Sequence, residues 1–273
     1  MTDRYAVIGN PIGFSKSPYI HSTYAQVTGQ VLEYTAIEGA LGEFVSTVDA
    51  FRAADGLGMN ITAPFKLDAF AYATEHSERA KLAGAANAMK FDGERVIAEN
   101  FDGVGLVRDV VHNLNRPLKG KRVLLLGAGG AARGALLPFL AQNPAELVIA
   151  NRNVDKACEL VQIGSAQGNV RGCAYTELVG QTFDVVFNAT SASLRAELPP
   201  VPASVFADGG LAYELAYAKG LTPFLRLAQN AGVKHLADGV GMLAEQAAEA
   251  FEWWRGVRPD TRAVIEKLTV PLV

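Results

Sequence analysis

The first half of the chain places polar side chains where one predicted element gives way to the next. Two serine hydroxyls stand at the start of a predicted helix, whose unpaired N–H groups attract a carboxylate. Asparagine amides both donate and accept hydrogen bonds, which suits a ligand rich in hydroxyl groups. These residue types indicate a site for a small hydroxylated acid, made by Ser15, Ser17, Asn60, Thr62, Lys66, Asn87, Asn100 and Asp102.

The local sequence leaves other roles open for several of these residues. Ser17 is also a good helix N-cap. Asn87 and Asn100 are also typical turn residues. Lys66, at the end of the stretch MNITAPFK, could equally be a solvated surface cation. Other motifs of the chain must decide between these roles.

A glycine-rich turn follows a buried strand predicted at Arg122–Leu126 and precedes a helix predicted at 133–142. In Gly127-x-Gly129-x-x-Ala132, the first glycine permits a tight turn and the second lets the backbone approach a pyrophosphate. The small third residue allows helix–strand packing. Phosphates then contact unpaired N–H groups at the helix N-terminus. This context predicts a dinucleotide site, and a turn chosen only for packing is the alternative.

The next predicted strand, Glu146–Ala150, ends at Asn151 and Arg152. NAD-specific sites usually carry Asp or Glu at this tip, to accept from the ribose 2′-OH. Here the tip offers an amide, a guanidinium and, a few residues on, Lys156. A guanidinium binds phosphate through two parallel hydrogen bonds, so we predict NADP(H). Asp155 opposes this interpretation, and Arg152 as a solvated loop cation is the alternative.

The elements that must position these residues alternate between strand and helix. Strand signals occur at 5–8, 31–37 and 58–62, and helical spacing occurs between them at 17–28 and 41–54. This alternation is typical of a parallel α/β sheet. Such sheets bind ligands outside the carboxyl ends of their strands, where the polar residues stand.

Shorter elements complete the chain. The stretch 115–120 has the composition of a linker, after which the strand–helix pattern restarts. We predict further helices at 68–73, 77–82, 104–113, 154–163, 223–231 and 242–254, and further strands at 88–91, 96–98, 183–187, 211–215 and 233–236.

The bulk composition excludes several classes of protein. Apolar residues make up 49% and charged residues 19% of 273 residues, which is typical of a packed globular protein. The net charge is −3 without a Lys/Arg block, which argues against nucleic-acid binding. Cys158 and Cys173 form no CxxC or Cys/His cluster, so neither a metal site nor a disulfide framework is predicted. Neither a signal peptide nor a membrane span is expected.

The motifs, taken in order, resemble the signature of the shikimate dehydrogenase family. The resemblance covers essentially the whole chain. It is carried by SKSP at 15–18 with His21, NITAPFK at 60–66, GAAN at 84–87, NFDG at 100–103, GAGG at 127–130, NR at 151–152, NATS at 188–191, and the segment from Asp238 through Gln246 to Ala247.

This resemblance implies NADP-linked, reversible reduction of 3-dehydroshikimate to shikimate. It implies two α/β domains with the active site between them. Residues 1–102 plus 238–273 would form a substrate domain with a mostly parallel sheet, and residues 103–237 a Rossmann NADP-binding domain. The implied protein is a cytoplasmic monomer or homodimer that binds small molecules, without nucleic acid, membrane or metal.

The positions of the motifs also imply residue roles. Lys66 and Asp102 would be the catalytic pair. Hydride reduction of a ketone needs a proton donor at the oxygen, and oxidation needs the same group as base. Lys66 would transfer this proton, with Asp102 orienting it. The implied substrate residues are Ser15, Ser17, Asn60, Thr62, Asn87, Phe101, Tyr217 and Gln246. The implied cofactor residues are Gly127, Ala128, Gly129, Gly130, Ala131, Asn151, Arg152, Lys156, Ala189, Thr190, Ser191 and Gly239.

Three positions depart from the family pattern. Ala88 and Phe101 stand where threonine is usual, and Glu214 stands where aspartate is usual. A phenylalanine facing the pocket would forfeit a substrate hydrogen bond, at a cost of about 0.5–1.5 kcal/mol. From the sequence alone, Phe101→Thr is therefore expected to lower the KM for shikimate. The alternative is that Phe101 points away from the pocket.

These departures leave alternatives open. The chain could be a paralogue that oxidises shikimate slowly, or one that prefers quinate, with NAD as cofactor. It could also be a non-catalytic NADP-binding sensor, because fold does not fix function. A sensor would have no reason to keep both Lys66 and Asp102.

Overall fold

The computed structural model describes residues 2–217 and 220–272, which form two compact units. The first unit runs up to Gly105 and includes Ala244–Val264, and the second comprises Leu106–Leu243 and the chain from Ile265 onwards. These limits differ from the predicted ones, since 103–105 group with the first unit and 238–243 and 265–272 with the second. The divisions fall inside the helices α5 (Asp102–Arg108), α9 (Val240–Arg255) and α10 (Arg262–Leu268), so no loop composition marks them.

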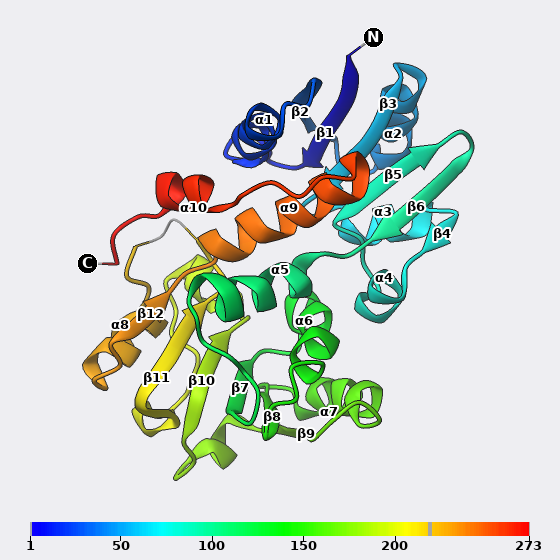
Figure 1. Cartoon of the computed structure of the whole chain (residues 1–273). Helices are drawn as coiled ribbons and strands as arrows, with labels where there is room; N and C mark the ends of the chain where they lie inside the picture. The colour runs from blue at the N-terminus through cyan, green and yellow to red at the C-terminus, as the bar shows by residue number, and fades with distance from the viewer. Residues whose placement is uncertain (1, 218–219, 273) are drawn as a thin grey trace. The chain divides into compact units, whose positions relative to one another are not determined.

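The first unit contains a six-stranded mixed sheet in the order β2-β1-β3-β5-β6-β4 (Figure 1). Strands β1, β2 and β3 are parallel, whereas β5 runs antiparallel to both β3 and β6. Its strands are β1 (Asp3–Gly9), β2 (Leu32–Glu38), β3 (Gly56–Ile61), β4 (Glu75–His76), β5 (Ala88–Asp92) and β6 (Arg95–Glu99). Its helices include α1 (Ser17–Thr28), α2 (Phe44–Ala53), α3 (Lys66–Tyr72) and α4 (Glu78–Ala83).

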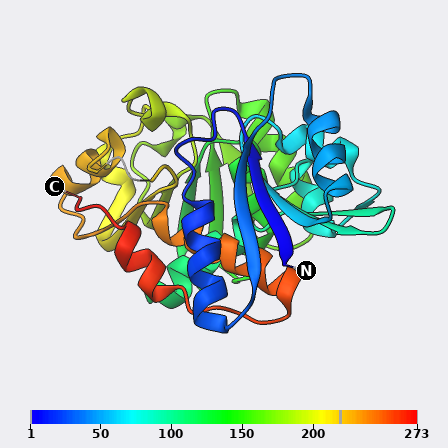
Figure 2. The same cartoon turned by 90° about the horizontal axis from the view of Figure 1, so that it is seen from above.

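Helix α1 begins and ends where its sequence predicts. Pro18 lies in its first turn, and Gly29 adopts a left-handed conformation at its end. Ser17 is the first helical residue rather than the N-cap, so that alternative is wrong; the cap position belongs to Lys16. The Ser15 hydroxyl accepts from the Ser17 N–H instead, at 3.3 Å. Figure 2 shows α1 lying along β2.

Alternate residues of β1 pack against opposite faces of the first sheet. Tyr5 and Val7 join one hydrophobic cluster, which includes Trp254 of α9. Ala6 and Ile8 join another, which includes Phe65. Because successive side chains of a strand point to opposite faces, a central strand covered on both sides is apolar throughout.

The second unit contains a six-stranded sheet in the order β12-β11-β10-β7-β8-β9, and all its pairs are parallel. This is the Rossmann order, whose ligands bind where the strand order reverses, here between β7 and β10. The strands are β7 (Arg122–Leu126), β8 (Glu146–Ala150), β9 (Val170–Cys173), β10 (Phe183–Asn188), β11 (Phe206–Glu214) and β12 (His235–Ala237). The helices include α6 (Gly130–Leu140), α7 (Val154–Gly164) and α8 (Pro223–Asn230).

Both faces of the second sheet are also covered. Leu125 and Ile149 pack in one cluster, and Leu124 and Val148 in the other, beside Phe224 of α8. Across residues 2–217 and 220–272, every helix is too short or too polar to cross a membrane. In the same two stretches, no three or more His, Cys, Asp or Glu side chains gather as a metal site would require.

Several elements differ from their predictions. The segment 115–120 lies inside the second unit rather than between units. The predicted helix 104–113 ends in a π-helical turn at Asp109–Asn113. Strands β4 and β9 and helix α10 were not predicted. A Cβ on Gly172 of β9 would lie only 3.1 Å from Ala157 of α7, so close packing demands a glycine that weakens the strand signal.

Candidate functional site

Lys66 and Asp102 meet in the first unit, with Lys66 Nζ 2.6 Å from Asp102 Oδ2. Lys66 begins α3, shortly after β3 ends, and Asp102 begins α5, shortly after β6 ends. The Lys66 side chain is 34% exposed and the Asp102 side chain 15%. A ligand can therefore reach the pair, although protein covers most of both groups. An ammonium held by a carboxylate in this way can exchange a proton with a ligand oxygen.

Asn87 connects this pair to Gln246, another predicted substrate residue. Its Nδ2 donates to Asp102 Oδ1 at 2.8 Å and to Gln246 Oε1 at 3.2 Å. Its Oδ1 accepts from the Phe101 N–H at 2.9 Å. The two Asp102 oxygens thus have different partners, which fixes the plane of the carboxylate. Lys66, Asp102, Asn87 and Gln246 therefore form one hydrogen-bonded group.

The β5–β6 hairpin brings the parts of this group together. Ala88 at the start of β5 pairs with Glu99 at the end of β6. The residues just outside the hairpin, Asn87 and Asn100, therefore lie at the same end. Asn100 Oδ1 then accepts from the Asp102 N–H at 3.1 Å, which orients the start of α5.

Buried partners hold Asn60, another predicted substrate residue. The Tyr34 hydroxyl donates to Asn60 Oδ1 at 2.7 Å, and Asn60 Nδ2 donates to the Asn87 carbonyl at 3.3 Å. Burial raises the pKa of the Tyr34 phenol, with the Ser17 hydroxyl partly offsetting this, so the phenol stays a neutral donor. His21 stacks on Tyr34, and burial lowers the His21 pKa to about 3, so it is neutral. Sequence reasoning missed Tyr34, since it stands in a plain strand pattern.

The prediction that the Phe101 ring faces the substrate is wrong. The side chain is 3% exposed and belongs to the cluster around Tyr5 and Trp254. Its ring packs edge-on against Trp253 and lies beneath the Arg79 guanidinium. The N–H and the side chain of Phe101 point in different directions. The N–H faces Asn87, and the ring enters the core.

This geometry replaces the expectation that Phe101→Thr lowers the KM for shikimate. Removing a buried ring leaves a cavity, so we expect Phe101→Thr to lower the free energy of unfolding by about 3 kcal/mol. The KM for shikimate should not fall. Denaturant unfolding together with shikimate titrations would check both statements. A variant with unchanged stability and a lower KM would show that the ring does reach the pocket.

Two predicted residues of the second unit have distinct surroundings. Tyr217 follows β11 and is 37% exposed, and its role in substrate binding stays a prediction. A Cβ on Gly239 would lie 2.1 Å from the Leu215 carbonyl oxygen, so packing alone requires glycine there. In the first unit, Thr62 directly follows the carboxyl end of β3, where polar residues were expected.

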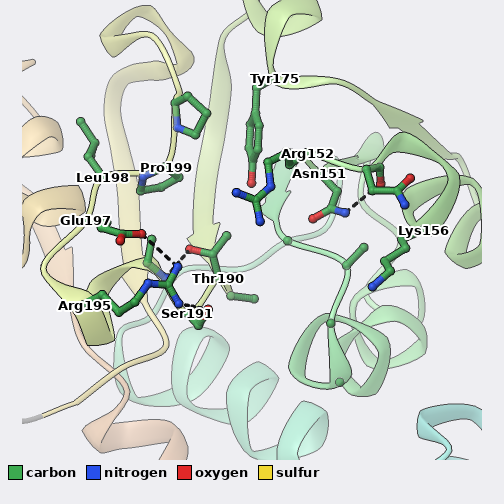
Figure 3. Close-up of a pocket in the computed structure, with 18 residues that line it drawn as sticks. Asn151, Arg152, Lys156, Tyr175, Thr190, Ser191, Arg195, Glu197, Leu198 and Pro199 are labelled. Atoms are coloured by element: carbon green, nitrogen blue, oxygen red, sulfur yellow. Dashed lines mark hydrogen bonds and ion pairs between the residues drawn. The ribbon is translucent and has the colours of Figure 1, made fainter.

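A pocket of about 560 Å³ opens at the carboxyl ends of β7, β8 and β10 (Figure 3). It contains ten of the twelve predicted cofactor residues, whereas Ala131 and Gly239 do not line it. Its lining is Gly127, Ala128, Gly129, Gly130, Asn151, Arg152, Asn153, Lys156, Tyr175, Ala189, Thr190, Ser191, Ala192, Arg195, Glu197, Leu198, Pro199 and Pro200.

The glycine-rich turn fits a pyrophosphate. Gly127 has a φ of +103°, and a side chain there would also meet the backbone of Ala189 at 3.2 Å. Cβ atoms on Gly129 and Gly130 would enter open space, which leaves room for a ligand at the backbone. Helix α6 begins at Gly130 with neither a side-chain cap nor an acidic residue in its first turn. Its free N–H groups can therefore bind phosphate oxygens.

The cations predicted to select NADP(H) line one side of this pocket. Figure 3 shows Arg152 and Lys156 there, with Tyr175 above Arg152. Asp155, which argued against NADP(H), is not part of the lining. Asn153 accepts from the Asp155 N–H at 3.0 Å and caps α7, so Asp155 lies in the first turn of that helix.

Arg195 and Glu197 line the opposite side of the pocket, and sequence reasoning missed both (Figure 3). Arg195 donates to Glu197 at 2.9 Å and to the Ser191 hydroxyl at 3.3 Å. The Arg195 guanidinium lowers the pKa of the Glu197 carboxyl. An isolated arginine in a short 3₁₀ turn carries no recognisable motif, although its closeness to NATS at 188–191 was a usable signal.

Comparison with family models assigns three consecutive parts of the chain. Residues 7–89 match the shikimate dehydrogenase substrate binding domain. Residues 109–196 match shikimate / quinate 5-dehydrogenase. Residues 239–269 match the shikimate 5′-dehydrogenase C-terminal domain.

Similar proteins align along nearly the whole chain. An NADP⁺ shikimate dehydrogenase from Nitrosospira multiformis is 53% identical over 98% of both chains. The crystal structure of an Ael1 enzyme from Pseudomonas putida is 62% identical, with a TM-score of 0.95 and full coverage of both chains. A Thermus thermophilus shikimate 5-dehydrogenase in complex with NADP(H) and shikimate is 29% identical, with a TM-score of 0.85 over 97% of this chain and 98% of its own. The chain therefore belongs to the shikimate dehydrogenase family.

Proposed function

We propose that the chain catalyses the NADP-dependent, reversible reduction of 3-dehydroshikimate to shikimate. The observation that carries this proposal is the pairing of Lys66 with Asp102 at 2.6 Å, in a chain whose relatives are NADP⁺ shikimate dehydrogenases. A sensor would need the pocket lined by Gly127 and Arg152 but not this partly exposed ion pair.

A bound nicotinamide would supply or accept the hydride, and side chains of the protein would supply or accept the proton. In reduction, Lys66 Nζ donates a proton to the ketone oxygen; in oxidation, it takes the proton of the hydroxyl. Asp102 holds the ammonium in place and can accept a second hydrogen bond from a substrate hydroxyl. Asn87 and Gln246 keep the Asp102 carboxylate oriented.

Substrate binding is proposed to use predicted polar residues of the first unit, with Tyr217 of the second. Ser15 and Ser17, at the start of α1, would bind the carboxylate. Asn60, Thr62, Asn87, Tyr217 and Gln246 would bind the ring hydroxyls, since amides and hydroxyls serve as both donors and acceptors.

Cofactor binding is proposed to use both sides of the second unit's pocket. The N-terminus of α6 would hold the pyrophosphate, and Arg152 with Lys156 would hold the 2′-phosphate. Asn151 and the loop of Ala189, Thr190 and Ser191 would complete the contacts in the pocket. The roles of Ala131 and Gly239, which do not line it, stay predictions.

A spectrophotometric panel tests the proposal. Shikimate and quinate, each with NADP⁺ and with NAD⁺, would be compared by kcat/KM from the absorbance of the reduced nicotinamide. Shikimate with NADP⁺ should give the highest value. A higher value for quinate or for NAD⁺ would replace the substrate or cofactor, and no turnover in any arm would refute the enzyme. Cell fractionation and size-exclusion chromatography would test the predicted cytoplasmic location and the monomeric or homodimeric state.

A further inference from the structure

Glu214 is a buried acid that the proposed reaction does not use. It is the last residue of β11 and has no exposed surface. Its Oε2 accepts from Asn188 Nδ2 at 2.9 Å, from Thr222 Oγ1 at 3.2 Å and from the Ser193 hydroxyl, while its Oε1 accepts from the Ala216 N–H at 3.2 Å. A carboxylate costs free energy to bury unless donors surround it in this way.

The hydrogen bonds of Glu214 continue to the dinucleotide pocket. Asn188, also fully buried, accepts through Oδ1 from the Thr190 N–H at 3.1 Å and from the Thr190 hydroxyl at 2.7 Å. Thr190 Oγ1 accepts in turn from the Ala192 N–H at 3.3 Å. Thr190 and Ala192 line the pocket, and Ala189 between Asn188 and Thr190 abuts Gly127. The shape of this wall therefore depends on where Asn188 and Ser193 are held.

We propose that Glu214 is a positioning residue for dinucleotide binding, because its carboxylate fixes the loop 188–193 in the shape that forms one wall of the pocket. The inference rests on the proposed function, in that the ligand of the pocket is NADP(H). It assigns a role to a buried acid for which the proposed reaction has no use.

The donors around Glu214 require a carboxylate rather than an amide. Asn188 Nδ2 and the Ala216 N–H can only donate, and they face different oxygens of Glu214. A glutamine must turn its NH₂ group toward one of these two donors, whichever way it is placed. Either Asn188 Nδ2 or the Ala216 N–H would then lose its hydrogen-bond acceptor, although the size of the side chain is unchanged.

Titration of NADPH by protein fluorescence tests this role. We expect Glu214→Gln to raise the Kd for NADPH about tenfold, because a bond to a charged group is lost. Glu214→Asp keeps the charge and should stay within about threefold of the original chain. The matched control is Val205→Ala, which opens a cavity in the hydrophobic cluster of Val148 and Phe224, at the amino end of β11. It should lower stability yet leave the Kd unchanged.

Hydrogen exchange of residues 188–193 provides a readout that does not need the ligand. It should accelerate in Glu214→Gln and not in Val205→Ala. If Glu214→Gln does not fold, Ser193→Ala removes one donor and should raise both the exchange and the Kd. Unchanged exchange or Kd in the folded variant tested, an aspartate as weak as glutamine, or an equal effect of Val205→Ala would overturn the inference. Failure of the unaltered chain to bind NADPH would refute the proposed function instead, with exchange still testing Glu214.

Discussion

Replacing Lys66 by alanine is expected to lower kcat for shikimate oxidation by about a thousandfold, the contribution typical of a well-placed acid–base group. Lys66 Nζ is held 2.6 Å from Asp102, in a position that a ligand can reach. Alanine removes the group that exchanges the proton. Binding of NADPH should stay normal, because the pocket lined by Gly127 to Pro200 lies entirely in the second unit.

Steady-state kinetics and NADPH titrations on the same preparations would separate these effects. Asp102→Asn should lower kcat less, by about a hundredfold, because the lysine remains but loses its charged partner. Lys81→Ala is the matched control, since Lys81 is an exposed cation of α4 in the same unit and pairs with an exposed glutamate, Glu78. Near-normal turnover of Lys66→Ala would remove Lys66 from the mechanism.

Replacing Arg152 by alanine is expected to raise the KM for NADP⁺ by about 10- to 100-fold, the equivalent of about 1.5–3 kcal/mol for a charged hydrogen-bonded group. The guanidinium stands at the tip of β8 and lines the pocket beside Lys156. NAD⁺ lacks the 2′-phosphate, so its KM should change little. The preference for NADP⁺ over NAD⁺ should therefore fall by nearly the same factor as the KM for NADP⁺ rises.

Initial rates at varied NADP⁺ and NAD⁺ would measure this preference. Arg226→Ala is the control, because Arg226 is an exposed cation of α8 in the same unit and does not line the pocket. An equal rise of both KM values in Arg152→Ala would show that Arg152 holds a part common to both dinucleotides. The assignment of Arg152 to the 2′-phosphate would then be withdrawn.

Local sequence signals predicted the elements that have clear start and stop residues or continuous apolar runs. Helix α1 lies between Pro18 and Gly29, and β7 and β8 are continuous apolar runs whose limits were predicted as found. Strand β9 was missed because Gly172 serves packing against α7 rather than strand propensity. The unit boundaries differ from the predicted domain limits, because they fall inside helices, where composition does not change.

The candidate site was predictable where a motif names a residue, and less so where packing decides. The family resemblance implied the Lys66–Asp102 pair, and the glycine-rich turn with the tip of the next strand predicted much of the pocket around Gly127. It could not show that the Phe101 ring turns into the core, since one residue can place its N–H and its side chain on opposite sides. Tyr34, Arg195 and the partners of Glu214 depend on contacts between distant strands and loops, which no local pattern records.

The β5–β6 hairpin can vary in length at its tip but not in the register of its strands. Its ladder is fixed from Ala88 opposite Glu99 to Asp92 opposite Arg95, while Gly93 and Glu94 at the far tip are exposed. Extra residues inserted at that tip would leave the ladder in step, whereas a slip of one residue along it would reverse the facing of every side chain. The tip is thus a natural place for an affinity tag or a reporter peptide.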